Sequence, residues 1–237
     1  MKSDQHRIPK SPAQPKSPKD ALLDAAEALY AENGFDGVAL RELTKRAGTN
    51  LGSVNYYFGS KENLLGEVVS RRIRPINARR MQALETALAK AGTNPPKLEE
   101  VLDAFVRPLF EGTEDPQQRE SLRRLIVRVF MAADSALAHL FEKEILPVGR
   151  QFGAGVARAR PNLHPRQVVA GLFFFAGAMI NTLASRKKLE AVSAIIGELP
   201  DDNELLQALV KFGVAGFDAL GGGANSNPIS SQPSPNV

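Results

Sequence analysis

Apolar residues recur at helical spacing through almost the whole chain, and this repeat constrains the fold more than any other feature. In residues 20–32, for example, Leu22, Ala25, Ala26 and Leu29 fall on one face of a helix. No stretch alternates apolar and polar residues with the period of two that a half-buried strand requires. The sequence therefore predicts an all-α fold. The expected helices span residues 20–32, 39–47, 50–57, 61–90, 98–111, 116–133, 135–158, 165–188 and 203–220.

Glycine and asparagine separate the first four of these helices. Asn33-Gly34 ends the first helix, Gly48 separates the second from the third, and Gly59-Ser60 separates the third from the fourth. Asn50 and Ser60 are suitable N-cap residues for the helices that follow them. Three short helices with a tight turn between the second and third predict a helix-turn-helix domain, which we place at residues 20–66.

The third helix, within the stretch TNLGSVNYYFGSKENLL, is unusually rich in small, polar and aromatic residues. One face, carrying Val54 and Phe58, can pack on the first two helices, while the other face can lie in a DNA major groove. Small residues near its start allow close approach of the backbone, and amides and hydroxyls can bond to bases or phosphates. The residues assigned to this surface are Asn50, Gly52, Ser53, Asn55, Tyr56, Tyr57 and Lys61. A second interpretation stays open from the residues alone, in which the tyrosines pack in a core and Gly52-Ser53 is only a turn.

Residues 67–220 should form a second helical domain. Pro75 is expected to kink or break the fourth helix, and Pro147 with Gly149 allows the segment 135–158 to be two helices. The apolar run 168–184 is shorter than the ~20 residues of a membrane span and contains Asn181 and Thr182, so a buried helix is expected. Within it, residues 173–175 are three phenylalanines, which cannot all face one side of a helix. A partner helix in a dimer would cover the remainder.

The two ends of the chain differ from its middle. Residues 1–19 are rich in Pro, Ser and Lys, and their net charge of five minus one, or +4, predicts a disordered basic arm. Residues 221–237 contain no charged residue and should be a disordered tail. Basic residues concentrated near one end favour a polyanionic partner. A basic arm that only keeps the protein in solution is an equally good explanation of the first segment taken by itself.

Several classes of function are disfavoured. The chain has no cysteine, and its three histidines, His6, His139 and His164, are far apart in sequence, so we expect no thiolate or histidine metal site. No nucleophile–base pair or phosphate-binding glycine loop is apparent, so we expect neither an enzyme nor a cofactor. The N-terminus lacks the apolar core of a signal peptide, and with the absence of cysteine this predicts a cytoplasmic protein without a membrane anchor.

The helix-turn-helix segment closely resembles the DNA-binding domain of the TetR family of transcriptional regulators. The resemblance covers about 47 residues and is carried by Asn33-Gly34-Phe35, by residues 45–49 (KRAGT) and above all by residues 57–62 (YFGSKE). It implies a homodimer that binds double-stranded DNA, with a helical C-terminal domain that dimerises and binds a small-molecule effector. It also implies that the protein is a regulator, in most such cases a repressor. Carried over position by position, the implied DNA contacts add Leu40, Arg41 and Thr49 to the residues assigned above.

This chain departs from the family pattern at two places. Val38 and Ala39 stand where the family usually has Thr or Ser at the N-cap of the second helix, and the lost cap costs roughly 1 kcal/mol. Asn55-Tyr56 replaces the Tyr-His that is common in the recognition helix, so the base preference of other members does not transfer.

The C-terminal half is loosely similar to a TetR subgroup that includes fatty-acid-responsive repressors. This similarity, with the richness in Phe and Leu, predicts an apolar or acyl effector with an acidic end. Arg128, Phe174 and Asn181 are candidate effector contacts. Each has a simpler alternative: Arg128 fits a solvated ladder with Glu120 and Arg124, and Asn181 fits a satisfied core amide or a dimer contact.

Overall fold

The computed structural model describes residues 17–33, 37–111, 122–124, 126–127 and 139–222. These residues form helices and connecting turns, with no strand among them, which confirms the all-α prediction. They divide into two compact units, and the boundary between the units lies inside one long helix, between Val68 and Val69. Of the predicted disordered arm (1–19) and tail (221–237), residues 1–16 and 223–237 lie outside the described residues. The prediction is wrong for residues 18–19, which begin α1, and for residues 221–222, which end α11.

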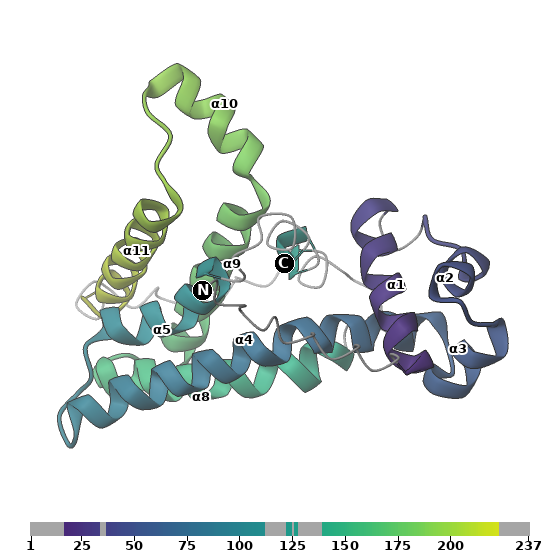
Figure 1. Ribbon diagram of the computed structural model, residues 1–237. Coiled ribbons are helices and arrows are strands. Elements are labelled where there is room, and N and C mark those ends of the chain that lie inside the picture. Colours follow the sequence, from purple (N-terminus) through teal and green to yellow (C-terminus); the bar gives the residue numbers. More distant parts are fainter. Residues whose placement is uncertain (1–16, 34–36, 112–121, 125, 128–138, 223–237) are drawn as a thin grey trace, which may run out of the picture. The chain divides into compact units, whose positions relative to one another are not determined.

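The N-terminal unit contains α1 (Pro18–Asn33), α2 (Leu40–Ala47), α3 (Leu51–Phe58) and the first turns of α4 (Lys61–Ala91) (Figure 1). Helices α2 and α3 both pack against α1 and against each other. Their contact surfaces form a core of residues that are at most 8% exposed: Leu22, Ala26, Leu29, Tyr30, Leu43, Val54 and Phe58.

Local hydrogen bonds set the ends of these helices where the sequence predicts them. Gly48 ends α2 with φ of 65°, a conformation that glycine adopts at little cost. The Asn50 side chain accepts a hydrogen bond from the Ser53 amide at 3.0 Å, and the Ser60 hydroxyl accepts one from the Asn63 amide at 3.1 Å. Helix α1 begins at Pro18 rather than at residue 20, because the Ser17 hydroxyl caps it by accepting from the Asp20 amide at 3.1 Å.

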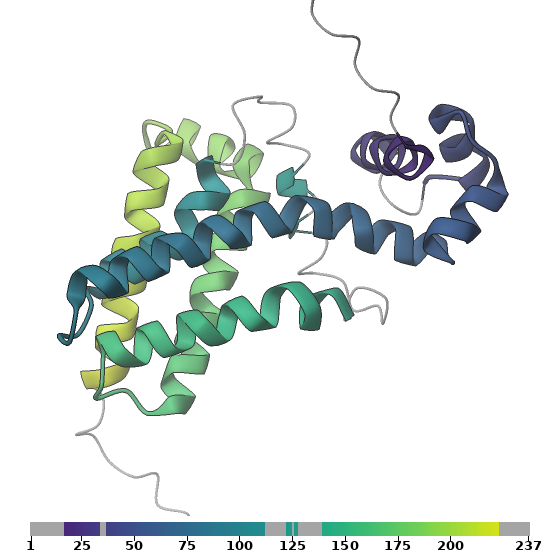
Figure 2. The same ribbon diagram turned by 60° about the horizontal axis from the view of Figure 1, so that its bottom comes forward.

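The C-terminal unit contains the rest of α4 together with six further labelled elements. They are α5 (Leu98–Glu111), the π-helical turn η1 (Phe141–Ile145), α8 (Leu146–Ala159), α9 (Pro165–Ala184), α10 (Arg186–Ile196) and α11 (Asp202–Gly222). Helix α11 packs against α5 and α9, and α8 packs against the same two helices. Both views show α8 beside the C-terminal half of α4 (Figures 1 and 2).

Two helix predictions in this unit are wrong, and two others concern segments that are only partly described. The segment 165–188 is not one helix, because α9 ends at Ala184 and α10 starts at Arg186. The predicted break at Pro75 is wrong, since α4 continues through it from Lys61 to Ala91. The segment 135–158 does change within its described part, where the π-helical turn passes into α8 just before Pro147. Of the segment 116–133, only residues 122–124 and 126–127 are described, and these are helical.

Helices α9 and α11 pack closely through two reciprocal contacts, in each of which a glycine of one helix meets a phenylalanine ring of the other. A Cβ built on Gly171 would lie 2.3 Å from the Phe217 ring, and one built on Gly213 would lie 2.6 Å from the Phe175 ring. Real Cβ atoms essentially never come so close to another atom, so each ring occupies space that only a glycine leaves open. The two helices therefore approach each other more closely than larger residues would permit.

Two helices in the described part of the chain are long and apolar enough to cross a membrane by length and composition alone. They are α9, with 20 residues and a mean hydropathy of 1.6 in its most apolar window, and α11, with 21 residues and 1.2. The prediction of a buried helix at residues 168–184 holds only in part for the single chain, because 33% of the most apolar window of α9 is buried. Phe175 is 2% exposed, whereas Phe173 and Phe174 are 76% and 64% exposed.

Candidate nucleic-acid interface

Helix α3 has one buried face and one exposed face. Val54 and Phe58 are 0% and 7% exposed and belong to the core shared with α1 and α2. On the other side, Tyr56 is 82% exposed and Tyr57 is 37% exposed, with their rings in edge contact at 4.9 Å between centroids. Core packing, the alternative explanation of these tyrosines, therefore does not hold. Leu51, at 43% exposure, also lies on this surface and was not among the predicted contacts.

The start of α3 is organised by Asn50. Its side-chain oxygen accepts hydrogen bonds from the Ser53 amide and, at 3.3 Å, from the Ser53 hydroxyl. The oxygen is committed to the cap, so the group that Asn50 can offer to DNA is its side-chain NH₂. A Cβ on Gly52 would lie 3.1 Å from this same oxygen, so a larger residue there would crowd the cap.

Among the predicted contacts outside α3, Arg41 is exposed, while Leu40 and Lys61 are partly buried. The N-cap of α2 is Ala39 and provides no side-chain hydrogen bond, as the sequence predicts. The Thr49 hydroxyl is buried and has no hydrogen-bond partner among the residues that the structure describes, so in this conformation it is not presented to DNA.

Some charged side chains near the interface are bound to other residues of the N-terminal unit. Arg46 forms paired hydrogen bonds of 2.9 and 3.0 Å with the carboxylate of Glu32, which join α2 to α1 and lower the pKa of Glu32. Backbone and Ser60 hydrogen bonds lower the pKa of Glu62, so this carboxylate stays negative in the first turn of α4. Burial raises the pKa of the Tyr30 hydroxyl, and the nearby charge of Glu62 adds to this effect. The exposed cations that remain for phosphates on α2 are Arg41 and Lys45.

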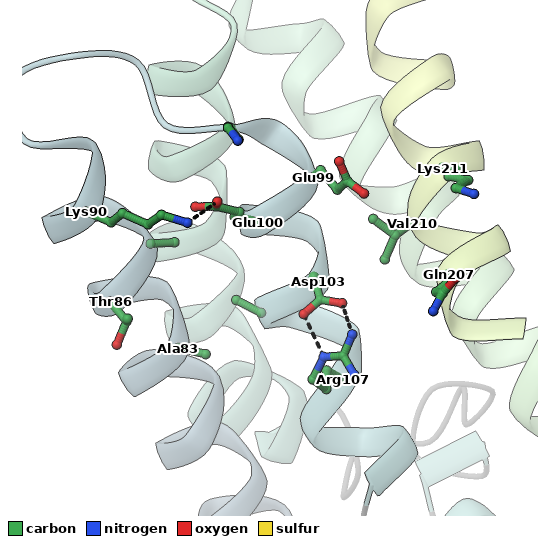
Figure 3. Close-up of a pocket in the computed structure, with 13 residues that line it drawn as sticks. Ala83, Thr86, Lys90, Glu99, Glu100, Asp103, Arg107, Gln207, Val210 and Lys211 are labelled. Atoms are coloured by element: carbon green, nitrogen blue, oxygen red, sulfur yellow. Dashed lines mark hydrogen bonds and ion pairs between the residues drawn. The ribbon is translucent and has the colours of Figure 1, made fainter. Parts of the chain in front are cut away.

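The predicted effector contacts do not gather around a cavity. Phe174 and Asn181 are exposed on α9, where Asn181 accepts a hydrogen bond from the Ser185 hydroxyl at 3.2 Å, and Arg128 lies outside the described residues. A hollow of about 650 Å³ opens between α4, α5 and α11 (Figure 3). Neither Phe174 nor Asn181 lines it. Its charged rim is paired within itself, Lys90 with Glu100 and Arg107 with Asp103, each at 2.7 Å.

A buried polar cluster in the C-terminal unit was not predicted. The Glu144 carboxylate, in the π-helical turn, accepts from the Ser70 hydroxyl at 2.9 Å and from Arg74 Nε at 3.0 Å. Its backbone carbonyl accepts from Asn77 Nδ2 at 2.7 Å. Ser70, Arg74 and Asn77 lie on one side of α4 and bracket Pro75. The available signal was the placement of Asn77, and of Arg80 beyond it, in an otherwise apolar stripe of α4.

Metal ligands do not gather either. Among the side chains that the structure describes, no group of three His, Asp or Glu residues is arranged to hold an ion.

Comparison with known proteins matches both units. A model of the bacterial regulatory proteins of the tetR family matches residues 22–68, and a model of the tetracyclin repressor-like C-terminal domain matches residues 103–216. The HTH-type transcriptional repressor KstR of Rhodococcus jostii is 28% identical over 152 residues, which are 64% of this chain and 64% of that protein. KstR2 of Mycolicibacterium smegmatis is 34% identical over 79 residues, 33% of this chain and 38% of the relative. The match thus covers 64% of the length of KstR and 38% of that of KstR2, which is less than two thirds of each.

Solved structures share the fold. The fatty acid degradation regulator FadR from Bacillus halodurans is 16% identical, with a TM-score of 0.57 over 91% of this chain and 100% of that one. A transcriptional regulator from Aquifex aeolicus is 18% identical, with a TM-score of 0.53 over 83% and 97% of the two chains. Family matches over both units, the helix-turn-helix geometry of α2 and α3, and this common fold lead to one conclusion: the chain belongs to the TetR family.

Proposed function

We propose that this protein is a cytoplasmic transcriptional regulator, acting as a repressor that leaves its operator when a small effector binds. The observation that carries the proposal is the exposed face of α3, where Asn55, Tyr56 and Tyr57 project outward from a helix whose other face is fixed in a core. Amide and phenol groups on a short exposed helix are suited to base edges and phosphates in a major groove. The curated relatives, which are named as repressors, support the same function.

DNA selection tests this proposal. The full-length protein should enrich a small set of fragments from genomic DNA of its source, and the enriched sites should share a palindrome-like sequence. Affinity for them should fall steeply with salt, because phosphate contacts release counterions. Retention of no fragment above background, or equal retention of all fragments, would contradict a sequence-specific regulator.

The binding form should be a two-fold dimer. One short recognition helix makes too few base contacts for tight specific binding, and two such helices in a dimer reach half-sites ~34–36 Å apart or a multiple of that distance. The exposed Phe173 and Phe174 on α9 supply an apolar surface of the kind that dimerisation buries. This placement favours the dimer interface over the effector site for Phe174 and for Asn181.

The effector is an apolar or acyl molecule with an acidic end. The aromatic interior of the C-terminal unit supports this choice, with the Phe105 ring 5.0 Å from Phe152 and 6.2 Å from Phe175 between centroids. So does the shared fold with a protein described as a fatty acid degradation regulator. Arg128 stays a candidate contact that no observation tests.

The effector acts through α4, the helix that contains the boundary between the two units. We expect α4 to pivot near Arg74-Pro75, where proline removes one hydrogen bond of the helix and its ring crowds the preceding turn. The hydrogen bonds from Ser70, Arg74 and Asn77 to Glu144 hold α4 on both sides of this point. An effector can shift α4 only through different affinities for its two settings.

The basic N-terminal arm adds affinity with little specificity, because its cations attract phosphates whatever the base sequence. Because Ser17 caps α1, a deletion that tests the arm should remove residues 2–16 and keep the cap. The salt dependence of DNA binding should decrease while operator preference is retained. An unchanged salt dependence would show that the arm makes no phosphate contacts.

A further inference from the structure

Arg80 is a buried cation in the interior of the C-terminal unit. Its side chain is 6% exposed and lies on the stripe of α4 that faces the core. The neighbouring positions of that stripe, Ile73, Ile76 and Leu84, are apolar and no more than 3% exposed. Arginine is almost never buried to this extent unless a partner compensates its charge.

The nitrogen atoms of the Arg80 guanidinium have unequal hydrogen-bond partners. Nε donates to the carbonyl of Phe105 at 2.7 Å, and the guanidinium carbon lies 4.5 Å from the centroid of the Phe105 ring. The terminal nitrogens have weaker partners: Nη1 is 3.3 Å from Asn77 Oδ1, and Nη2 is 3.8 Å from the sulfur of Met179. Both Nη groups thus have only neutral acceptors at long distances. Together they could bind the two oxygens of a carboxylate.

No carboxylate among the described residues pairs with Arg80. Its acceptors are a carbonyl, an amide and a thioether, and the buried Glu144 carboxylate is bound by Ser70 and Arg74 instead. Burial lowers the pKa of Arg80 to about 10, so the group is still a cation at neutral pH. A buried charge without an opposite charge is costly, and a neutral side chain such as Gln could bond to the Phe105 carbonyl without that cost.

We propose that Arg80 binds the carboxylate of an acidic effector through its Nη groups, with the apolar body of the effector lying against Phe105, Phe152 and Phe175. The thioether of Met179 would leave its place beside Nη2, which an unbranched and flexible side chain does at small cost. This inference rests on the proposed function and narrows it, because it requires a free carboxylate and excludes an ester or thioester at this position.

The same geometry connects the site to the expected pivot of α4. Asn77 lies between Arg80 and Glu144: its oxygen faces Arg80 Nη1 and its nitrogen donates to the Glu144 carbonyl. A carboxylate that draws Nη1 away from Asn77 therefore acts on the residue that ties α4 to the π-helical turn, two positions beyond Pro75.

The test compares decanoate with methyl decanoate, two probes of the same chain length that differ in charge. Isothermal titration calorimetry on the full-length protein at pH 7.5 should give at least ~10-fold tighter binding of decanoate than of the ester, the size expected of one charge-assisted contact. Arg80→Met should remove this preference, Arg80→Lys should keep part of it, and the exposed neighbour variant Arg79→Met should keep all of it. Nuclear magnetic resonance of carboxyl-labelled decanoate bound to the wild type should show a carboxyl pKa well below that of the free acid.

Equal binding of acid and ester by the wild type overturns the proposal, as does a preference that survives in Arg80→Met or a failure of both probes to bind. If Arg80→Met does not fold, the wild-type preference and the pKa of the bound probe decide the question. If ester and acid release operator DNA equally, the proposal that Arg80 binds a carboxylate is wrong, but the proposal that the protein is a regulator still stands. Conversely, a protein that selects no genomic DNA would lose the proposed function, while the acid–ester comparison would still decide whether Arg80 binds carboxylates.

Discussion

Helices α3 and α9 both expose large aromatic side chains, but the residues around those side chains differ. On α3, Tyr56 and Tyr57 carry hydroxyls and share their surface with the amides of Asn50 and Asn55. On α9, Phe173 and Phe174 have no polar atoms, and the exposed Val169 and Gly177 lie near them. An exposed ring with hydrogen-bonding neighbours suits a hydrated, charged surface such as DNA, whereas an exposed ring among apolar neighbours suits another apolar surface. Exposed aromatic side chains make both surfaces candidate interfaces, and the composition around them favours a different partner for each.

The largest expected effect is on the apolar surface. The double substitution Phe173→Glu and Phe174→Glu places charges where a dimer would bury them, which should weaken self-association by ~3 kcal/mol or more, at least ~100-fold. Sedimentation equilibrium measures this, with the exposed Gln151→Glu on α8 as a control for added negative charge. A double variant that stays as dimeric as the control would show that α9 does not form the dimer interface.

The next effect concerns base recognition by α3. Asn55→Ala removes a side chain that can pair with a base edge and should change discrimination at one operator position by ~1–3 kcal/mol. Binding to a library of operator variants measures this preference. A uniform loss of affinity across the library would instead assign Asn55 to the DNA backbone.

The N-caps of α2 and α3 allow two matched substitutions with smaller expected effects, which concern stability. Asn50→Ala removes the bond to the Ser53 amide and should cost ~1 kcal/mol of stability, whereas Ala39→Ser adds a cap that α2 lacks and should stabilise the protein by ~0.5–1 kcal/mol. Denaturant unfolding of the full-length protein measures both. Opposite signs are required, and a stabilising Asn50→Ala would contradict the capping role.

A smaller effect is expected where α4 meets phosphate. Lys61→Ala should reduce affinity for all sequences alike and lower the salt slope by about 1, since one phosphate contact is lost. Tyr57→Phe should also weaken binding without altering base preference, because the Tyr57 hydroxyl is expected to contact the DNA backbone. Filter binding over a range of salt concentrations tests both, and wild-type affinity of Lys61→Ala at physiological salt would remove that residue from the interface.

The smallest expected effect concerns α4, through which the effector is proposed to change DNA binding. Pro75→Ala should stiffen α4 and reduce the effector-induced loss of operator affinity a few-fold, while binding without effector is unchanged. Operator affinity of both proteins, titrated with acyl ligands, measures this. Equal effector-induced losses in wild type and variant would place the pivot elsewhere.

These differences also explain which features the sequence predicts well. In the N-terminal unit, the cap at Asn50, the turn at Gly48 and the cap at Ser60 are decided by residues at most three positions apart, so local chemistry is sufficient. The end of α9 and the start of α10 carry no such signal, because Ser185-Arg186 contains neither glycine nor proline. The Ser185 hydroxyl donates to Asn181 and does not cap α10.

The buried polar residues of α4 show the same limit. Asn77 and Arg80 fall at the spacing of the buried stripe, but their partners Glu144 and Met179 lie 67 and 99 positions further along the chain. Periodicity can place a charged residue on a buried face, but it cannot identify the distant atoms that surround it. The exposure of Asn55, Tyr56 and Tyr57 was predictable because it follows from one local helix, whereas the surroundings of Arg80 were not, because they depend on long-range packing.

The two glycine contacts between α9 and α11 have a mechanical consequence. Rotation or sliding of either helix would drive the Phe217 ring into the backbone at Gly171, or the Phe175 ring into the backbone at Gly213. The pair therefore has few degrees of freedom and should move as one rigid body. Because α9 also carries the exposed phenylalanines, the surface expected to join two copies of the chain belongs to a fixed frame. An effector could then move α4 while the α9 surface stays in place, and the dimer could change its contacts with DNA without dissociating.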